Sequence, residues 1–460
     1  MGGLHTRNKE RVAENSRLYL GSDNTIFKKI DDINVILNPD LPNIMVADDV
    51  GKKIFERCKD MQSTHEIIEL LSKEFSLDPR DVNRYVESLI NAGFLSNTPP
   101  VFPKVTRSCD YLRSLVLHVT EECNLRCKHC YFAATDPRER ELSLTEFLSV
   151  IGQFAELGGQ SLLITGGEPL LQKEKLYAII KEARNQKIDR ILINTNGTLI
   201  TPKDASLFKE NNINVGVSLD GATSETHEFI RGKASYEKAL MGIRALRSAD
   251  VNVVKGTTLM KPNLHEAADI IRLAKEIDVP TVDFVIVKPT GRAKTNQSAL
   301  EFTVDDLVTT MKTILETSKK TGIKTSFEEL QSSTRTFTRR DLCGAGLGLL
   351  GLAANGDVYP CDALHDERLK AGSIRERSLG DIWRNSPVLK AFQEMSVVNL
   401  EGCKDCEYKF ICGNGCPADT YITYGNFSKC SPLCAMYKEI FSYMIAQISK
   451  DLWKEINFKA

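Results

Sequence analysis

The run Cys123-Asn124-Leu125-Arg126-Cys127-Lys128-His129-Cys130-Tyr131 places three thiols in one short segment, with three and then two residues between them. Thiolates at this spacing can converge on one iron–sulfur cubane. A [4Fe–4S] cluster takes four protein ligands when it only transfers electrons, so three ligands would leave one iron open to a small molecule. A structural zinc site is the alternative, but zinc sites usually combine paired C-x2-C elements into four ligands, and no fourth ligand lies nearby in the sequence.

This spacing, followed by an aromatic residue, resembles the signature of the radical S-adenosylmethionine (SAM) enzymes. In that family the open iron holds the amino and carboxylate groups of SAM. The resemblance implies that Cys123, Cys127 and Cys130 ligate a [4Fe–4S] cluster. It also implies that Tyr131 packs near the adenine of SAM, with a core aromatic as its alternative role. We expect His129, inside the same run, to face solvent rather than to act as a ligand.

Strands and helices alternate around this run and downstream of it. Such alternation predicts an α/β fold with a parallel sheet and right-handed crossovers, and six units match the open, partial (β/α)6 barrel typical of radical SAM enzymes. Active sites of closed (β/α) barrels lie at the C-terminal ends of the strands, and the cysteine run begins just after the first one. The candidate strands are Leu115–Val119, Ser161–Thr165, Arg190–Thr195, Asn214–Leu219, Val251–Thr258 and Val282–Val287, and the candidate helix caps are Ser143 with Glu146, Thr201 before Pro202, and Asn263.

Further segments at the strand ends resemble the rest of the SAM site in that family. Gly166-Gly167-Glu168-Pro169 resembles the turn that meets the methionyl amino group, because glycines let a backbone approach a ligand and a carboxylate offsets an ammonium. Asn196, Ser218 and Asp220 resemble residues that line the ribose and methionyl side. Arg231 resembles the arginine that pairs with the SAM carboxylate. The alternatives are ordinary turn chemistry for the strand-end residues and a surface salt bridge for Arg231.

A second field of cysteines follows in the C-terminal part of the chain. Its segment C-x2-C-x5-C-x3-C, from Cys403 to Cys416, resembles the SPASM extension, which carries auxiliary iron–sulfur clusters. The alternative is a pair of zinc sites. The resemblance implies that Cys343, Cys361 and Cys416 hold a first auxiliary cluster and that Cys403, Cys406, Cys412 and Cys434 hold a second. Cys430 is then spare: either it completes the first auxiliary cluster, or that cluster keeps an open iron.

Asp362 directly follows Cys361. In sulfatase-maturing relatives an aspartate at this place accepts a proton from the substrate, so the resemblance makes Asp362 a candidate catalytic base. The alternative is a polar residue that merely lies beside the cluster.

Residues 25–98 form a separate compact unit in the sequence pattern. Short strands ending at Asn38-Pro39-Asp40 precede three helices, the second opened by Ser63 with Glu66 and the third by Asp78-Pro79. The order looks like a winged helix-turn-helix, but nine Lys or Arg against thirteen Asp or Glu disfavour DNA binding. The unit instead resembles the PqqD-like element that binds the leader of a precursor peptide at a sheet edge. A structural domain without a ligand is the alternative.

The composition of the chain indicates its cellular compartment and excludes some classes of binding partner. No signal peptide opens the chain and no apolar run is long enough to span a bilayer, so we expect a cytoplasmic protein that is not bound to a membrane. In that compartment the thirteen cysteines indicate metal ligands rather than disulfides. The net charge of −1 gives no indication of a polyanionic partner, and no nucleic acid is expected.

These resemblances divide the chain into a flexible segment (1–24), a PqqD-like domain (25–98), a linker (99–113), a radical SAM partial barrel (114–325) and a SPASM domain (326–460). The combination best resembles maturases of ribosomally synthesised peptides of the sactipeptide and ranthipeptide type. It implies SAM and three [4Fe–4S] clusters as cofactors, a flavodoxin or ferredoxin as reductant, and a precursor peptide as substrate. A 5′-deoxyadenosyl radical would take hydrogen from a peptide carbon, which would then join a cysteine sulfur in a thioether.

Three other functions compete with this one. The same architecture can form carbon–carbon or carbon–oxygen crosslinks or decarboxylate a peptide terminus. An anaerobic sulfatase-maturing enzyme would instead oxidise Cys or Ser to formylglycine, which Asp362 favours and the N-terminal domain disfavours. A non-catalytic peptide-binding or iron–sulfur regulator would not need the complete set of SAM-site residues.

Overall fold

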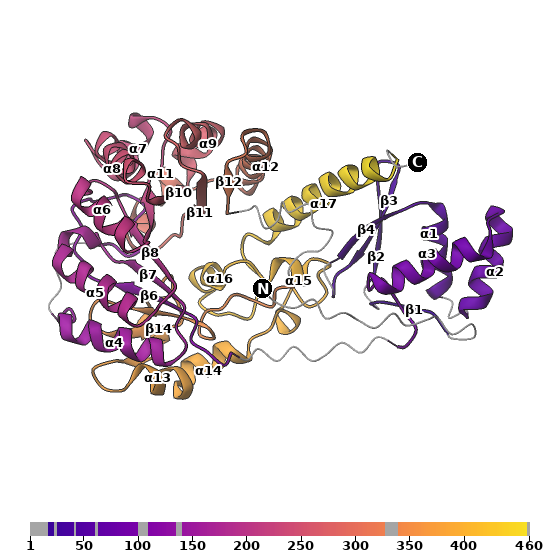
Figure 1. Cartoon of the computed structure of the whole chain (residues 1–460), viewed down its shortest axis with the longest axis horizontal. Helices are drawn as coiled ribbons and strands as arrows, with labels where there is room; N and C mark the ends of the chain where they lie inside the picture. Colours follow the sequence, from indigo (N-terminus) through magenta and orange to yellow (C-terminus); the bar gives the residue numbers. More distant parts are fainter. Residues whose placement is uncertain are drawn as a thin grey trace.

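The computed structural model describes residues 17–22, 25–40, 43–59, 63–99, 109–134, 140–326 and 339–457. An α/β barrel, a cysteine-rich region and a small N-terminal domain follow one another along the long axis of the molecule (Figure 1). Residues 1–16 of the expected flexible segment and most of the expected linker lie outside the described residues. Within the described ranges, no helix combines the length and the apolar character needed to cross a membrane.

The barrel is built on parallel strands that stand side by side in chain order, from β6 at one end to β12 at the other. Both faces of the sheet are covered, which explains why strands such as β6 are apolar almost throughout. The six expected strands are confirmed, each to within one residue at either end. These six strands are β6 (Ser114–His118), β7 (Ser161–Thr165), β8 (Arg190–Thr195), β9 (Asn214–Ser218), β10 (Asn252–Leu259) and β11 (Thr281–Ile286), and a seventh, unexpected strand β12 (Lys324–Thr325) pairs in parallel with β11.

Helices connect these strands and lie along the outside of the sheet (Figure 1). Ser143 and Glu146 form the expected capping box, and Thr201 caps the helix that begins at Pro202. Asn263 is a correction: it lies inside a 3₁₀ helix and its side chain accepts a hydrogen bond from the Met260 amide. The helices are α4 (Leu144–Glu156), η1 (Pro169–Gln172), α5 (Lys173–Asn185), α6 (Pro202–Glu210), α7 (Ser224–Arg231), α8 (Tyr236–Ser248), η2 (Lys261–Glu266), α9 (Ala267–Glu276), α10 (Gly291–Thr295), α11 (Gln297–Leu300) and α12 (Val304–Thr321).

The cysteine-rich region continues the barrel sheet at its other edge. Strand β13 pairs in parallel with β6, and β14 and β15 add antiparallel strands, so that ten strands form one sheet. The region comprises β13 (Leu349–Leu352), β14 (Asp357–Tyr359), η4 (Glu367–Leu369), β15 (Gly372–Ser373), α13 (Leu379–Asn385), α14 (Pro387–Glu394), η5 (Val397–Asn399), α15 (Lys409–Cys412), α16 (Pro417–Tyr424) and α17 (Cys434–Asn457).

The N-terminal domain holds three helices against an antiparallel sheet ordered β2-β3-β4. Strand β4 is a correction, because the sequence pattern ended the strands at Asp40. A second correction concerns residues 17–22, expected to be flexible: Leu18 is buried and β1 pairs with β5. The elements are β1 (Tyr19–Leu20), β2 (Ile26–Ile30), β3 (Ile33–Asn38), β4 (Asn43–Ala47), α1 (Asp49–Lys59), α2 (Thr64–Phe75), α3 (Pro79–Asn91) and β5 (Leu95–Ser96).

Helix α17 joins this domain to the rest of the chain by packing across β3 and β4 (Figure 1). Along β3, Val35 and Leu37 belong to the core that includes α17, whereas Ile36 belongs to the core formed with α1–α3. This alternation follows from the two-residue period of a strand. Lys28 on β2 adds an ion pair with Glu407, the residue after Cys406.

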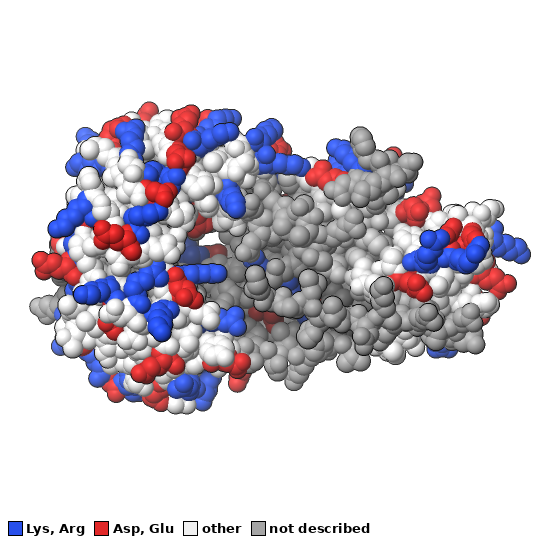
Figure 2. Space-filling view, in the orientation of Figure 1, with Lys and Arg blue, Asp and Glu red and all other residues white. Residues whose placement is uncertain are grey.

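Charges on the barrel surface are mixed. On the face drawn in Figure 2, lysines and arginines alternate with aspartates and glutamates over the helices of the barrel. That pattern accords with the low net charge, and the absence of a nucleic-acid partner stays a prediction.

Candidate active site

The first three cysteines lie in the loop that follows β6, at the C-terminal end of the barrel sheet. Burial raises the pKa of Cys123 to about 11 and also raises that of Cys127, and negative charge on the neighbouring thiols adds to both shifts. Cys123, Cys127 and Cys130 are therefore close together. Metal binding deprotonates such thiols, and three soft sulfur donors suit iron–sulfur chemistry.

The start of helix α10, which follows β11, supports this cysteine loop. The Arg292 guanidinium donates to the carbonyls of Cys127 (2.9 Å) and Ala134 (2.6 Å), and the Arg292 amide donates to the carbonyl of Cys130 (2.9 Å). Gly291 has φ +55°, and a Cβ there would lie 2.4 Å from the Tyr131 carbonyl oxygen. These contacts fix the backbone that carries the three thiols.

The turn after β7 packs against the same loop. Gly166 has φ +140°, and a Cβ at Gly167 would lie 1.9 Å from the Glu122 carbonyl oxygen. The amides of Gly167 and Glu168 donate to the carbonyls of Thr120 and Glu122, each at 2.7 Å. Only glycine fits such an approach of two backbones, which gives the Gly-Gly pair a structural reason beside its expected role at SAM.

Glu168 is fully buried and already has protein donors. Its carboxylate accepts from the Thr195 hydroxyl (2.6 Å), the Asn196 amide (2.8 Å) and the Leu170 amide (3.1 Å). These bonds tie the turn to the end of β8. A contact of Glu168 with the amino group of SAM stays a prediction.

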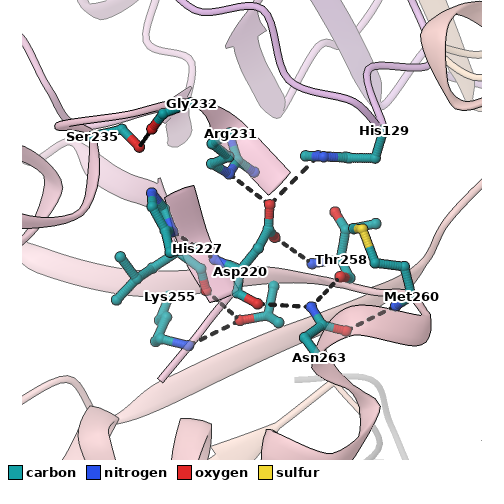
Figure 3. Close-up of polar contacts among 12 residues, drawn as sticks. His129, Asp220, His227, Arg231, Gly232, Ser235, Lys255, Thr258, Met260 and Asn263 are labelled. Carbon is teal, nitrogen blue, oxygen red and sulfur yellow. Dashed lines mark hydrogen bonds and ion pairs between the residues drawn. The ribbon is translucent and has the colours of Figure 1, made fainter. Parts of the chain in front are cut away.

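Asp220 and Arg231 form a buried pair beside the cysteine loop (Figure 3). The Arg231 Nε donates to Asp220 Oδ2 at 2.6 Å, and the Thr258 amide donates to Oδ1 at 2.8 Å. Burial alone would raise the pKa of Asp220, but the nearby Arg231 charge holds it well below its usual value. Arg231 is thus in a buried rather than a surface salt bridge, and its expected contact with the SAM carboxylate stays a prediction.

His129 is a correction, because its side chain is only 11% exposed instead of facing solvent. Its Nε2 lies 3.5 Å from Asp220 Oδ2 (Figure 3). Burial lowers the pKa of His129 to about 4, so the ring is neutral at neutral pH. Its Nδ1 is buried without a hydrogen-bond partner among the described residues. The cysteine loop is therefore tied to the end of β9 through this ring.

Asn196 and Ser218 lie at the C-terminal ends of β8 and β9, where the sequence predicts functional groups of the barrel. The Asn196 side chain donates to Asn124 beside Cys123 at 2.8 Å, which joins β8 to the cysteine loop. Ser218 ends β9 and is half-buried. Their expected contacts with SAM stay predictions.

Cys343, Cys361 and Cys416 come together from three distant parts of the cysteine-rich region. Burial raises the pKa of Cys361, and negative charge at Cys416 and Cys343 raises it further. Lys288, after β11, donates to the Cys416 sulfur at 3.4 Å and pairs with Asp419. A barrel residue thus contacts the first auxiliary group directly.

The second auxiliary group surrounds a small cavity whose lining includes Cys403, Cys406, Cys412 and Cys434. Burial raises the pKa of Cys403 and of Cys412 to about 12 each. Cys430 packs in one apolar cluster with Cys403, and its charge raises the pKa of Cys403 and of Cys434. Its alternative role as a ligand of the first auxiliary cluster stays a prediction.

One cavity of about 510 Å³ lies between the first cysteine loop and the first auxiliary group. Its walls include Tyr131, next to Cys130, and Asp362, next to Cys361. Burial raises the pKa of Tyr131, and negative charge on Asp362, Cys130 and Cys361 adds to the shift. The placement of Tyr131 against the SAM adenine stays a prediction.

Asp362 has both carboxylate oxygens engaged. The Tyr131 hydroxyl donates to Oδ2 at 2.6 Å and His118 Nε2 hydrogen-bonds to Oδ1. Burial alone would raise the pKa of Asp362, but the charge and hydrogen bond of His118 bring it to about 2. Asp362 is therefore ionised at neutral pH, and its expected role as a catalytic base stays a prediction.

Comparisons with known proteins agree with this geometry. The family model of the radical SAM superfamily matches residues 117–290, that of the SPASM iron–sulfur cluster-binding domain residues 343–407, and that of coenzyme PQQ synthesis protein D residues 34–95. The chain belongs to the radical SAM superfamily. It is a radical SAM/SPASM enzyme with an N-terminal PqqD-like domain, and its cofactors are SAM and [4Fe–4S] clusters, auxiliary clusters included.

Two curated relatives illustrate the range of the family. The AdoMet-dependent heme synthase of Methanosarcina barkeri (strain Fusaro / DSM 804) is 30% identical over 346 residues, which is 70% of this chain and 96% of that protein. The mycofactocin maturase MftC of Mycobacterium tuberculosis (strain ATCC 25618 / H37Rv) is 26% identical over 333 residues, covering 71% and 84%.

Two solved structures share the fold. Native anSMEcpe with bound AdoMet superposes with a TM-score of 0.63 at 19% identity, covering 74% of this chain and 99% of that one. Streptococcus suis SuiB bound to the precursor peptide SuiA gives a TM-score of 0.58 at 15% identity, covering 91% and 99%.

Several residues at the site were not expected from the sequence. His118 ends β6, at the strand end where the barrel rule places functional groups, so its position was a usable signal. Lys288 lies in the loop after β11 and Arg292 in helix α10, where no motif indicated them. His365 follows Asp362 closely, but only the fold brings it against β6.

Proposed function

We propose that this enzyme matures a ribosomally synthesised precursor peptide by forming an intrapeptide thioether, as in sactipeptides and ranthipeptides. The observation that carries the proposal is the shared cavity: Tyr131 and Asp362 form one hydrogen bond across it, each beside a cysteine of a different group. A peptide segment bound there would lie between the site of radical formation and an auxiliary cluster.

Residues of this chain would bind the cluster, orient SAM and exclude water from the cavity. Cys123, Cys127 and Cys130 would hold the cluster at which SAM binds. When bound, SAM and this cluster supply a 5′-deoxyadenosyl radical that takes a hydrogen atom from carbon. Asp220, buried and ionised, would orient Arg231 toward the SAM carboxylate. Tyr131 and its neighbours would exclude water from the cavity.

The auxiliary groups would serve electron transfer and substrate binding. Three [4Fe–4S] clusters are proposed in all, with the second auxiliary cluster closed by Cys403, Cys406, Cys412 and Cys434. The first auxiliary group offers three cysteines, which leaves a position for a substrate thiolate, since soft thiolates bind such iron well. A flavodoxin or ferredoxin would supply the reducing electron.

The PqqD-like domain would bind the leader of the precursor. Strands β2 and β4 are the edge strands of its sheet, and an extended peptide can add to such an edge through main-chain hydrogen bonds. Hydrogen exchange with and without leader peptide tests this point. Protection confined to residues 26–30 or 43–47 is expected, and unchanged exchange in both strands would contradict it.

The decisive experiment is anaerobic. The reconstituted enzyme is mixed with SAM, a reductant and a small cysteine-containing peptide encoded beside its gene, and mass spectra are taken before and after thiol alkylation. Loss of two hydrogens together with one alkylatable thiol is expected. Loss of two hydrogens with all thiols retained would replace the thioether by a carbon–carbon or carbon–oxygen bond.

A second candidate follows from the relative in Methanosarcina barkeri, whose name is AdoMet-dependent heme synthase and whose length is matched almost completely. Under it the cavity would take an iron porphyrin instead of a peptide. The PqqD-like domain favours the peptide. Conversion of an iron porphyrin, with the peptide left unchanged, would favour the second candidate.

A further inference from the structure

Two imidazoles at the cavity have no role in the proposed function so far. His118 ends β6 with its side chain fully buried, and His365 lines the cavity three residues after Asp362. One ring nitrogen of each histidine and one carboxylate oxygen of Asp362 lie within 4.8 Å of one another. The His365 ring stacks on Tyr359 with centroids 4.5 Å apart and planes 17° apart, which fixes its orientation.

Hydrogen bonding determines which nitrogens are free. His118 Nε2 hydrogen-bonds to Asp362 Oδ1, so Nδ1 is the remaining nitrogen of its ring. His118 Nδ1 and His365 Nε2 are buried, and neither has a hydrogen-bond partner among the described residues. Buried polar atoms without a partner are rare in folded proteins, so both call for an explanation.

The charges around His365 act on its pKa in both directions. Burial lowers the pKa of His365 to about 3, and the charge of His118 lowers it further, so in the free enzyme the ring is neutral and can accept a proton. Asp362 and Asp357 face it and oppose this shift. An ionised Asp362 would stabilise an imidazolium once it forms, as the carboxylate of an Asp–His pair does.

We propose that His365 takes up the proton that the substrate loses in this cavity, while His118, held by Asp362, positions and stabilises the new charge. This inference rests on the proposed function, because it assigns the proton acceptor of that reaction. Asp362 then acts through the histidines and does not itself become protonated.

The step balances in atoms and electrons. Joining a carbon to a cysteine sulfur breaks one C–H and one S–H bond and forms one C–S bond. The hydrogen atom of the C–H bond leaves to the 5′-deoxyadenosyl radical, and the S–H proton goes to His365. The one remaining electron goes to an auxiliary iron–sulfur cluster, the oxidant that the proposed function already supplies. A strong base is not required, because a thiol that binds metal loses its proton readily.

The test uses the full enzyme with His365→Gly and His365→Gln, and with His265→Asn as a matched control on an exposed histidine outside the cavity. Three quantities are measured for each: the dissociation constant of the precursor peptide, the 5′-deoxyadenosine formed, and the crosslink formed per SAM cleaved. Each is measured across pH, with and without added imidazole.

Loss of a proton acceptor should lower the crosslink per SAM cleaved by about 10²-fold. Peptide affinity and SAM cleavage should change less than twofold, and added imidazole should restore the crosslink in His365→Gly. His118→Asn should also lower the crosslink per SAM cleaved while peptide affinity and SAM cleavage are kept. Added imidazole should not restore the crosslink, because the His118 side chain is fully buried. His265→Asn should match the wild type in all three quantities.

Two results would overturn the proposal: wild-type crosslink yield in His365→Gln, or loss in His365→Gly that imidazole leaves unchanged at every pH. Failure of the proposed function looks different. A wild-type product whose thiols all stay alkylatable rejects the thioether, while the imidazole rescue still reports on His365. No product from the wild-type enzyme rejects both.

Discussion

The first cysteine group and the first auxiliary group differ in how the fold assembles them. Cys123, Cys127 and Cys130 come from one loop of eight residues, so their spacing alone brings the thiols together. Cys343, Cys361 and Cys416 come from three segments far apart in the chain, and only the fold brings them near one another. A local motif can thus be identified from sequence, whereas a site assembled from distant segments needs the fold.

The largest expected effect comes from breaking the local group. In Cys127→Ala, one ligand of an already three-cysteine site is lost, so we expect no SAM cleavage and about four fewer irons per chain. Iron analysis and 5′-deoxyadenosine quantification check this result. Wild-type SAM cleavage in this variant would contradict the assignment of the loop.

Loss of a ligand from the first auxiliary group should separate SAM cleavage from crosslinking, which Cys127→Ala loses together. In Cys361→Ala, SAM cleavage should continue while the crosslink per SAM cleaved falls at least tenfold, because the oxidant beside the cavity is lost. The two products are measured in the same reaction by mass spectrometry. Equal loss of both would mean that the two groups do not act independently.

Cys430 and Cys434 can be compared directly as candidate ligands of the second auxiliary cluster. Cys434→Ser should lose about four irons per chain, because Cys434 lines the second cavity. Cys430→Ser is the matched variant four residues away, and it should keep its iron and its electron paramagnetic resonance spectrum. Iron loss in Cys430→Ser that equals the loss in Cys434→Ser would make Cys430 a ligand.

The smallest effect concerns the buried network beside the first group. Burial lowers the pKa of His227 to about 3, well below the value of about 6.5 for an unfolded chain. As pH falls below about 6.5, the unfolded chain binds a proton that the folded chain does not, so stability decreases by about 1.4 kcal/mol per pH unit.

His227→Gln should remove this contribution between pH 7.5 and 5.5. Anaerobic denaturant unfolding at several pH values gives the slope of the unfolding free energy against pH for variant and wild type. His265→Gln, on the surface, should keep the wild-type slope. An unchanged slope in His227→Gln would show that this ring does not control the acid sensitivity of the barrel.

The sequence by itself determined the parts of this protein that depend on neighbours along the chain. The capping box of Ser143 with Glu146 and the apolar segment of β7 were predicted correctly, because caps and strand periodicity are local. The cysteine spacing likewise led to the radical SAM superfamily, and the pattern of residues 25–98 to a PqqD-like domain, both of which the comparisons confirm.

Tertiary structure decided what depends on distant neighbours. It covered most of the His129 side chain beside Asp220 and packed Cys430 with Cys403. It also joined His118 of β6 to Asp362 of the cysteine-rich region across 244 residues of sequence. Burial and partners at such separations set the pKa values and hydrogen bonds of these side chains, and no local pattern encodes them because the contacts exist only after the sheet has formed.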